Sequence, residues 1–139
     1  MRVSEIMTRD VETVSSEMDL MTAAEKMRIR DIGFLPVVEN DAVVGVITDR
    51  DITLRGLGEG RVPQLTTVRE IMTPILVWCY EDDVLTEVAN VMEENRVRRL
   101  LVLDGAKRLV GLISLDDLAA KMSSDRLLGT VLRNVTASR

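Results

Sequence analysis

Apolar and polar positions alternate along this chain in two periods, one typical of helices and one typical of strands. Apolar side chains at helical spacing form two sets: Met18, Met21, Ala24 and Met27, then Val84, Val88, Val91 and Met92. These sets predict helices over residues 18–30 and 84–95. Dense apolar runs predict strands at residues 34–38, 43–47, 100–103 and 109–113, and shorter β-prone runs occur at 11–14 and 77–79.

The order of these elements occurs twice because the sequence itself is repeated. Val-Ser-Glu-Ile-Met-Thr at residues 3–8 returns as Val-Arg-Glu-Ile-Met-Thr at residues 68–73, an offset of 65. The offset becomes 66 from the pair Gly45 and Gly111 onward, which indicates one inserted residue in the turn at residues 104–107. We therefore interpret the chain as a tandem duplication, with a short helix after the last strand of each copy, starting at Thr48 and at Ser114.

The duplication predicts an α/β fold of the α+β type, made of two β-α-β-β-α repeats. The expected boundaries are residues 1–62 for the first repeat, 63–123 for the second and 124–139 for a C-terminal tail. One repeat buries too little surface to be stable alone, so we expect the two to pack through their sheets about a pseudo-twofold axis. Such packing creates two equivalent clefts. In the tail, the spacing of Leu127, Leu128, Val131 and Leu132 predicts an amphipathic helix, with a basic arm as the alternative.

Composition removes many classes of enzyme. The chain has 139 residues and contains no histidine, one cysteine (Cys79), and one each of Phe, Tyr and Trp. A Ser–His triad, a Cys–His pair, a histidine-ligated metal, a four-cysteine zinc site and a disulfide framework all need residues that are absent here. We expect no catalytic residues, no metal ligands and no catalytic cofactor.

Charge and hydropathy bear on location and partners. The formal net charge of −5 argues against general binding to nucleic acids or anionic membranes. The first twelve residues lack the apolar segment of a signal peptide, and no apolar run approaches the length that spans a bilayer. A lone cysteine fits a reducing compartment, so a soluble cytoplasmic protein is expected.

Each repeat ends its last strand with a shared pattern: Gly, two apolar residues, Ser or Thr, two further residues, and Asp. The pattern covers residues 45–51 and 111–117. In a structural interpretation, Thr48 and Ser114 cap helices, the acids complete capping boxes, and the glycines mark a bend or bulge. In a ligand-binding interpretation, the hydroxyl contacts a phosphate, the Asp accepts both hydroxyls of a ribose, and glycine permits close approach. The pattern by itself leaves both interpretations open.

The repeated Ile-Met-Thr openings, the Gly-Phe-Leu-Pro-Val-Val strand at residues 33–38 and the two closing Gly-to-Asp patterns resemble a tandem pair of cystathionine-β-synthase (CBS) domains, also called a Bateman module. The resemblance covers residues 1–122. It implies a regulatory module that binds adenosyl nucleotides (AMP, ADP or ATP, with NAD or S-adenosylmethionine as alternatives) in two inter-repeat clefts. It also implies a homodimer in the form of a four-repeat disc, which signals through its shape or through a separate effector protein.

The resemblance also implies two sets of site residues. In one cleft, Asp117 would hold the ribose and Ser114 the phosphate side beside Arg98 and Arg99, with Glu12, Ile32 and Gly33 of the first repeat around the adenine. In the other, the corresponding residues would be Thr48, Arg50, Asp51, Thr73, Val77, Val97 and Arg98. We expect unequal sites, because Arg50 can attract a phosphate whereas Asp116 and Asp117 repel one.

Three classes of function remain open: a nucleotide-sensing regulator, a structural dimerisation module with empty clefts, and an enzyme. The third is disfavoured because no nucleophile–base pair accompanies Asp51 or Asp117.

Two features outside the repeat pattern have structural rather than functional interpretations. Arg96 would complement the dipole of a helix end, and Cys79 would be a buried thiol.

Overall fold

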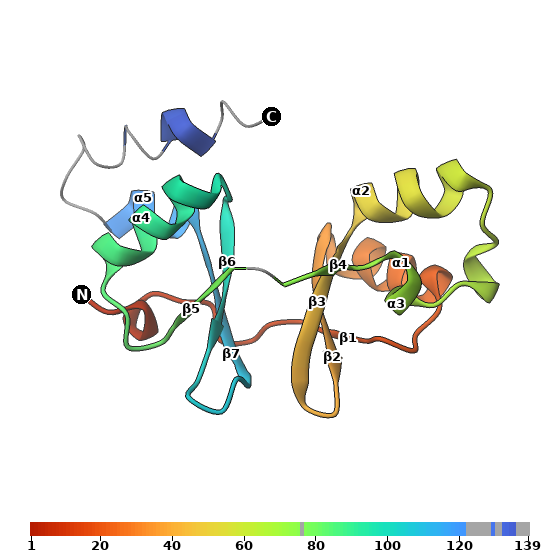
Figure 1. Cartoon of the computed structure of the whole chain (residues 1–139), viewed down its shortest axis with the longest axis horizontal. Coiled ribbons are helices and arrows are strands. Elements are labelled where there is room, and N and C mark those ends of the chain that lie inside the picture. Colours follow the sequence, from red (N-terminus) through yellow and green to blue (C-terminus); the bar gives the residue numbers. More distant parts are fainter. Residues whose placement is uncertain (76, 122–128, 130–131, 136–139) are drawn as a thin grey trace. The chain divides into compact units, whose positions relative to one another are not determined.

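The computed structural model describes residues 1–75, 77–121, 129 and 132–135, and it contains the β-α-β-β-α order twice (Figure 1). In the first half, the elements are η1 (Val3–Glu5), β1 (Val14–Ser15), α1 (Leu20–Arg30), β2 (Phe34–Glu39), β3 (Ala42–Thr48), α2 (Asp49–Asp51), η2 (Ile52–Gly56), η3 (Leu57–Glu59) and η4 (Pro63–Leu65). In the second half, they are α3 (Val68–Ile71), β4 (Thr73–Pro74), β5 (Trp78–Tyr80), α4 (Leu85–Asn95), β6 (Arg99–Leu103), β7 (Leu109–Ser114) and α5 (Leu115–Lys121). The mixed α/β fold class with two sheet-containing repeats is thereby confirmed.

Helix ends follow local chemistry. Helix α1 begins at Leu20 because Asp19 caps it, with Oδ1 accepting a 2.8 Å hydrogen bond from the Thr22 N–H. After β3, helical turns continue past Gly56 and Gly58 through Glu59, and Gly60, with φ of 77°, takes the left-handed conformation that stops them.

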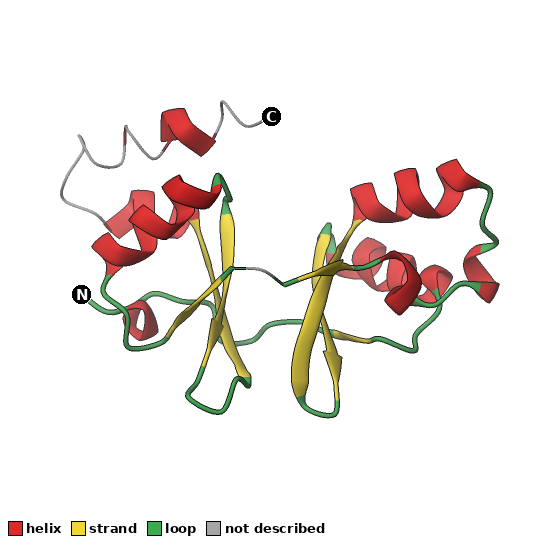
Figure 2. Ribbon diagram, viewed as in Figure 1, coloured by secondary structure: helices red, strands yellow, loops and turns green. Residues whose placement is uncertain are grey.

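The strands form two sheets with matching pairings. One sheet has the order β1-β2-β3-β4 and the other the order β5-β6-β7. In each, the first pair is parallel and the next pair antiparallel, and the register shifts beside Val37 in one sheet and beside Val102 in the other. In each unit taken by itself, helices lie on one side of the sheet (Figure 2). The bulge position is therefore duplicated along with the sequence.

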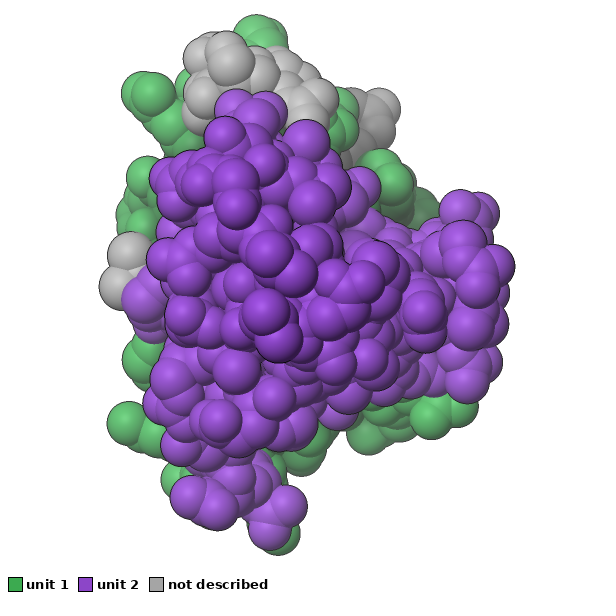
Figure 3. Space-filling model, turned by 90° about the vertical axis from the view of Figure 1, so that its right-hand side faces the viewer, with its two compact units in different colours: residues 1–11, 77–139 green, residues 12–76 purple. Residues whose placement is uncertain are grey.

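The chain divides into two compact units that differ from the sequence repeats. Unit 1 contains residues 1–11 and 77–139, and unit 2 contains residues 12–76 (Figure 3). The opening segment of each repeat, residues 3–8 or 68–73, thus packs with the body of the other repeat. Unit 2 is, in sequence, an insertion within unit 1.

Backbone hydrogen bonds hold these exchanged segments. In unit 1, Thr8 and Leu112 exchange two N–H···O bonds of 2.9 Å. In unit 2, β4 pairs with β3 at the corresponding place, with Thr73 opposite Val46. Val3 is fully buried in its unit. Each opening segment therefore completes the sheet and the core of the unit that it joins.

Each unit has its own apolar core. The core of unit 2 joins α1, β2 and β3 through buried side chains that include Leu20, Leu35 and Ile47. The core of unit 1 joins α4, β6, β7 and α5, with Met92, Leu100 and Ile113 among its buried side chains. Strands β2 and β6 each have a parallel and an antiparallel neighbour and are apolar almost throughout. Strand β3, which lies between β2 and β4, alternates between buried and half-buried positions over most of its length.

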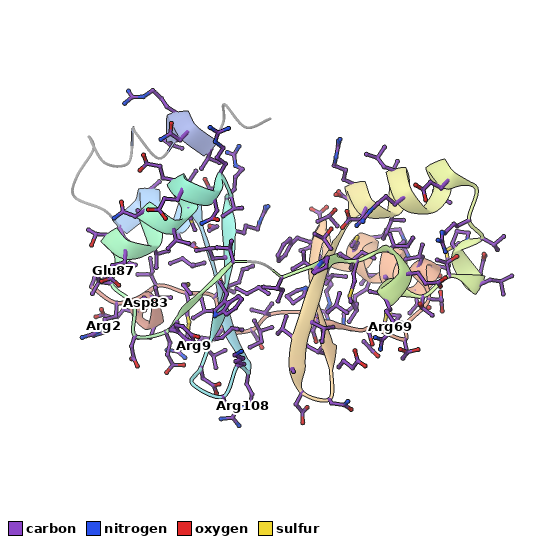
Figure 4. The ribbon with its side chains drawn as sticks, in the orientation of Figure 1. Arg2, Arg9, Arg69, Asp83, Glu87 and Arg108 are labelled. Carbon is purple, nitrogen blue, oxygen red and sulfur yellow. The ribbon has the colours of Figure 1, made fainter. Side chains whose placement is uncertain are left out.

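Charged contacts fasten α3 to the body of unit 2. Arg69, labelled in Figure 4, donates to Glu17 at 2.9 Å and to Glu39 at 2.6 Å. The two carboxylates raise the pKa of this guanidinium above its usual value, chiefly through the hydrogen bond to Glu39. Since Arg69 is accessible to solvent, we assign this cluster a role in orienting α3 rather than a large share of stability.

Most of the predicted tail helix lies outside the described residues. Residues 132–135 are helical, and Val135 is buried in the core of unit 1. Asn134 donates a 2.7 Å hydrogen bond to Glu93 of α4. These described tail residues thus pack on unit 1.

Candidate functional site

The end of each motif strand forms a capping box. In unit 2, Thr48 Oγ1 accepts from the Asp51 N–H at 3.1 Å, and Asp51 Oδ2 accepts from the Thr48 N–H at 3.0 Å. In unit 1, Ser114 and Asp117 make the same two bonds at 3.1 and 2.8 Å. All four residues are half-buried. The structural interpretation of the motif is therefore confirmed, and each carboxylate is presented with one oxygen already engaged.

The second carboxylate oxygen differs between the units. In unit 2, Oδ1 of Asp51 accepts a 3.1 Å hydrogen bond from Nη2 of Arg55, and the side chain of Asp51 is only 16% exposed. The same nitrogen donates to Thr73 Oγ1 at 3.0 Å and to the carbonyl of Ile71. In unit 1, Oδ2 of Asp117 likewise accepts from the Ser114 N–H, and the described residues include no bond between Asp117 and Lys121, the counterpart of Arg55. The described contacts of the two carboxylates thus differ at this position.

Arg55 was not singled out from the sequence. The available signal was a cation four residues after Asp51 on the same helix, the spacing of an ion pair. Arg55 also contacts Thr73, which lies 18 residues further along the chain, and the spacing of neighbouring residues does not reveal such a contact. Through Arg55, the structure connects the predicted site residues Thr48, Asp51 and Thr73.

Other predicted site residues of unit 2 have separate surroundings. Glu12 forms ion pairs with Lys26 at 3.2 Å and Arg30 at 3.3 Å, both on α1. Ile32 packs against the apolar core. Arg50 is exposed, and its backbone N–H binds its neighbour Asp49. The structure thus joins neither Glu12 nor Ile32 to Thr48 and Asp51 by a hydrogen bond.

The carbonyl of Gly33 accepts a 3.0 Å hydrogen bond from the Asp49 N–H. A Cβ atom on Gly33 would lie 2.6 Å from Oδ2 of Asp49, so a side chain there would displace that carboxylate. The corresponding pair in unit 1 is Arg98 and Leu115, joined by the same backbone bond at 2.8 Å. Leu115 is buried and leaves Arg98 exposed. One unit thus presents a carboxylate at this strand end where the other presents a guanidinium.

The remaining predicted residues belong to unit 1. Val77 and Val97 pack against its core, Arg99 pairs with Ser114 across β6 and β7, and Asp116 is exposed in the first turn of α5. Arg99 begins β6 opposite Ser114, the last residue of β7, and Arg98 directly precedes it, so both lie at the strand end that leads into Asp116 and Asp117. Their role beside a ligand stays a prediction.

The two motif glycines are explained by chain packing. A Cβ atom on Gly45 would lie 2.7 Å from the carbonyl oxygen of Thr73, and one on Gly111 would lie 2.5 Å from Sδ of Met7. Both glycines face the exchanged opening segment of the opposite repeat, beside the register shift. Close approach of a backbone carbonyl thus accounts for glycine at position 45, and at position 111 the Met7 side chain and the Thr8 carbonyl at 3.0 Å together crowd a Cβ atom.

Cys79 is a buried thiol, in agreement with the sequence interpretation. It lies on β5 with 2% of its surface exposed. Burial, with a smaller contribution from Asp83, raises the pKa of the thiol to about 12. At neutral pH the group is protonated and lacks the thiolate character that a reactive cysteine needs.

The family model for the CBS domain matches residues 3–57 and 68–124. The CBS domain-containing protein YhcV of Bacillus subtilis is 37% identical over 134 residues, which cover 96% of this chain and 94% of that protein. A crystal structure of Hypoxic Response Protein I, with two coordinated zinc ions, matches 88% of this chain and 99% of its own at 35% identity and a TM-score of 0.78. The CBS domain pair of protein MJ0100, solved with 5′-methylthioadenosine and S-adenosyl-L-methionine, matches 86% and 94% of the two chains at 28% identity and a TM-score of 0.74.

The zinc ions of Hypoxic Response Protein I raise the question of a metal site here. Zinc in proteins is held by Cys, His and carboxylate ligands. This chain has no histidine, its one cysteine is buried, and its described residues bring together no group of three or more Cys, Asp or Glu that could hold a metal. These residues do not fit a zinc ion.

Within the described part of the chain, no helix has the length and apolar character needed to cross a bilayer.

Proposed function

Because this chain belongs to the CBS domain family and carries two copies of the domain, we propose that it is a regulatory module that binds adenosyl nucleotides. The observation that carries the proposal is the paired hydroxyl and carboxylate at the same strand end of both units, Thr48 with Asp51 and Ser114 with Asp117. A half-buried carboxylate suits a ribose diol, and the neighbouring hydroxyl suits a phosphate or another polar group on the 5′ side. The adenosyl ligands of the CBS pair of MJ0100 support this ligand class.

We assign the binding groups as the sequence predicted. Asp51 and Asp117 accept ribose hydroxyls, and Thr48 and Ser114 contact the 5′ substituent. The backbone and aliphatic groups near Glu12, Ile32, Gly33, Thr73, Val77 and Val97 enclose the adenine, and Arg50, Asp116, Arg98 and Arg99 set the local charge. With Arg98 and Arg99 at the strand end of unit 1 and Asp49 and Arg50 at that of unit 2, the two sites differ in their preference for charged phosphates.

Ligand binding is tested on the whole chain by thermal shift and calorimetry with AMP, ATP, NAD and S-adenosylmethionine. A ligand at 100 times its dissociation constant adds about 2.7 kcal/mol to the free energy of unfolding. The matched variants are Asp51→Asn and Asp117→Asn, because an amide oxygen still accepts from the backbone N–H in each capping box while the charge that binds a diol is removed. We expect each variant to lose one binding event and to remain folded.

The other candidate is a structural dimerisation module, and a surface of unit 2 favours a role in assembly. Its described helical segments and the chain that follows expose large apolar side chains: Ile29 (68%), Leu54 (49%), Leu57 (56%), Val62 (51%) and Leu65 (82%). Four of the five lie within residues 54–65 and are thus close along the chain, and exposed apolar patches mark interaction sites. We propose that this surface contributes to a homodimer of the nucleotide-binding module, whose state is read by a separate cytoplasmic effector protein.

Light scattering tests the assembly, with an expected mass of twice the 15.5 kDa of one chain. Leu57→Glu should shift the population to monomer, whereas Lys107→Glu, on an exposed turn of unit 1, should leave it unchanged. A dimer that binds none of the four nucleotides would favour the structural module over the regulator. A monomer that binds these nucleotides would contradict the proposed dimer and leave the proposed nucleotide binding intact.

A further inference from the structure

Arg55 joins three acceptors at the motif of unit 2. Its Nη2 atom lies 3.1 Å from Oδ1 of Asp51 and 3.0 Å from Oγ1 of Thr73, and it also donates to the carbonyl oxygen of Ile71. Two of these acceptors belong to the segment that enters unit 2 from the second sequence repeat. A single guanidinium therefore connects the motif carboxylate to the exchanged segment.

The helix that carries Arg55 departs from regular α geometry. Residues Ile52–Gly56 form a π-helix directly after Asp51, whereas Leu115–Lys121 in the other repeat is α-helical throughout. Widened turns of this kind occur frequently at functional sites. The residue that corresponds to Arg55 is Lys121, and the described contacts of unit 1 include none between Lys121 and Asp117. Within the described residues, the ion pair between the motif carboxylate and the cation four residues later is thus found in the first repeat and has no counterpart at Lys121.

Both oxygens of Asp51 are engaged in this state. Oδ2 accepts from the Thr48 N–H at 3.0 Å, and Oδ1 accepts from Arg55. The carboxylate is 16% exposed and Arg55 is 44% exposed, so the guanidinium is the more movable of the two groups. A ribose diol that binds Asp51 with both hydroxyls needs the oxygen that Arg55 now occupies.

We propose that Arg55 is a built-in competitor for the ribose carboxylate, and that its displacement couples ligand binding at Asp51 to the segment Ile71–Thr73. The inference rests on the proposed nucleotide binding and adds a regulatory contact to it. When a diol takes Asp51, Arg55 loses its anionic partner, and its bonds to Ile71 and Thr73 are weakened. Unit 2 ends at residue 76, three residues after Thr73, so the bond between Arg55 and Thr73 lies close to the point where the chain passes from unit 2 to unit 1.

Calorimetry with adenosine on the whole chain tests the competition. Adenosine carries the diol without a phosphate, so loss of a cation has no direct electrostatic effect on the ligand. Arg55→Met should bind adenosine about threefold more tightly than the wild type, as expected for the removal of a partly exposed ion pair. Arg55→Lys, which keeps the charge without the planar fork, should lie between the two.

The matched control is Lys121→Met, which removes the cation at the same position of the other repeat and should leave affinity unchanged. In an Asp51→Asn background, which loses binding at this site, Arg55→Met should neither restore that binding event nor alter the remaining adenosine affinity, because the carboxylate for which Arg55 competes is absent. Equal or weaker binding of adenosine to Arg55→Met than to wild type would overturn the inference and leave nucleotide binding intact. Failure of every variant and the wild type to bind would instead remove the proposed function, and the inference with it.

Hydrogen exchange provides the readout for coupling. Adenosine should speed exchange of the Met72 and Thr73 amides in the wild type, and these amides should already exchange fast in Arg55→Met without ligand. A merely structural Arg55 would give fast exchange in Arg55→Met but no response to adenosine in the wild type. That result would overturn the coupling.

Discussion

The glycine within each motif strand is needed for close packing against the opening segment of the opposite repeat. At Gly45 the nearest obstacle to a Cβ atom is a carbonyl oxygen at 2.7 Å, and at Gly111 it is the sulfur of a methionine side chain at 2.5 Å. A methionine side chain can change rotamer, but a carbonyl in a paired strand cannot move without its neighbours. Each position faces a threonine carbonyl and a methionine side chain, and the two differ in which group is nearer: a Cβ atom on Gly111 would lie 3.0 Å from the Thr8 carbonyl oxygen.

We therefore expect Gly45→Ala to lower the free energy of unfolding by about 2 kcal/mol, in the range of over-packing substitutions, and Gly111→Ala to lower it by less. Urea titrations of the two variants measure the difference. Gly105→Ala, where a Cβ atom meets nothing within 4 Å, is the control that should change little. A larger loss for Gly111→Ala than for Gly45→Ala would contradict this explanation.

The capping boxes could be predicted from the sequence. Their members, Thr48, Asp51, Ser114 and Asp117, stand out because a motif repeated at a constant offset is visible without coordinates. Arg55 does not stand out, because two of its three acceptors lie in an exchanged segment far along the chain. The reason for glycine in the motif was equally hidden, since the approaching backbone comes from the opposite repeat.

At the scale of elements, the two long helices have equivalent bodies and different starts. Asp19 caps α1, and Oδ2 also accepts from the Thr22 hydroxyl at 2.9 Å. Helix α4 has Val84 at the corresponding position and no side-chain cap. The hydrogen bond from the Thr22 N–H, followed by the one from its hydroxyl, lowers the pKa of Asp19 below its ordinary value.

The lowered pKa predicts how the cap depends on pH. A carboxylate whose pKa is lower in the folded state stabilises the fold above its unfolded pKa, and this stabilisation is lost as pH falls through the folded value. Asp19→Ala should therefore unfold at lower urea concentration than the wild type at pH 7, and the difference should shrink toward pH 2. Val84→Ala at the uncapped helix should show no such pH dependence. A difference for Asp19→Ala that stays constant with pH would argue against the charged cap.

The pattern located the two long helices and the other predicted strands to within about two residues. The strand expected at residues 11–14 shares only Val14 with β1 (Val14–Ser15). The pattern could not locate the short segments η1, α3 and β4, because the opening blocks at residues 3–8 and 68–73 are too short for a period to emerge. The π-helix was missed for a related reason. Its sequence, Ile52–Gly56, has ordinary helical character, and the widened turn follows from tertiary contacts.

At the scale of the whole molecule, the compact units exchange the openings of the sequence repeats. Val3 and Val68 begin these openings at equivalent positions, and both are fully buried, one in each unit. Local pattern cannot reveal which of two similar bodies such a segment joins. The repeats were visible in the sequence, but the exchange was not.

Because the opening segments are exchanged, a destabilising substitution in the opening segment of one repeat should weaken the unit that contains the body of the other repeat. Val3→Ala should cost about 2 kcal/mol of stability through the loss of buried methyl groups. Hydrogen exchange should then speed up in α4 and β6 of unit 1, while α1 and β2 keep their protection. In the matched control, Val68→Ala, exchange should speed up in α1 and β2 while α4 and β6 keep their protection. Faster exchange in α1 and β2 for Val3→Ala would contradict the assignment of segment to unit.

The insertion of unit 2 within unit 1 has a mechanical consequence. Residues 1–11 and 77–139 belong to one compact body, so the first described residues and the last lie in the same unit. Tension applied at the two ends of these residues is therefore carried first by unit 1, across contacts such as the Thr8–Leu112 pair. Unit 2 bears no load until the opening segment detaches. Under tension, unit 1, which contains Asp117, is therefore expected to unfold before unit 2, which contains Asp51.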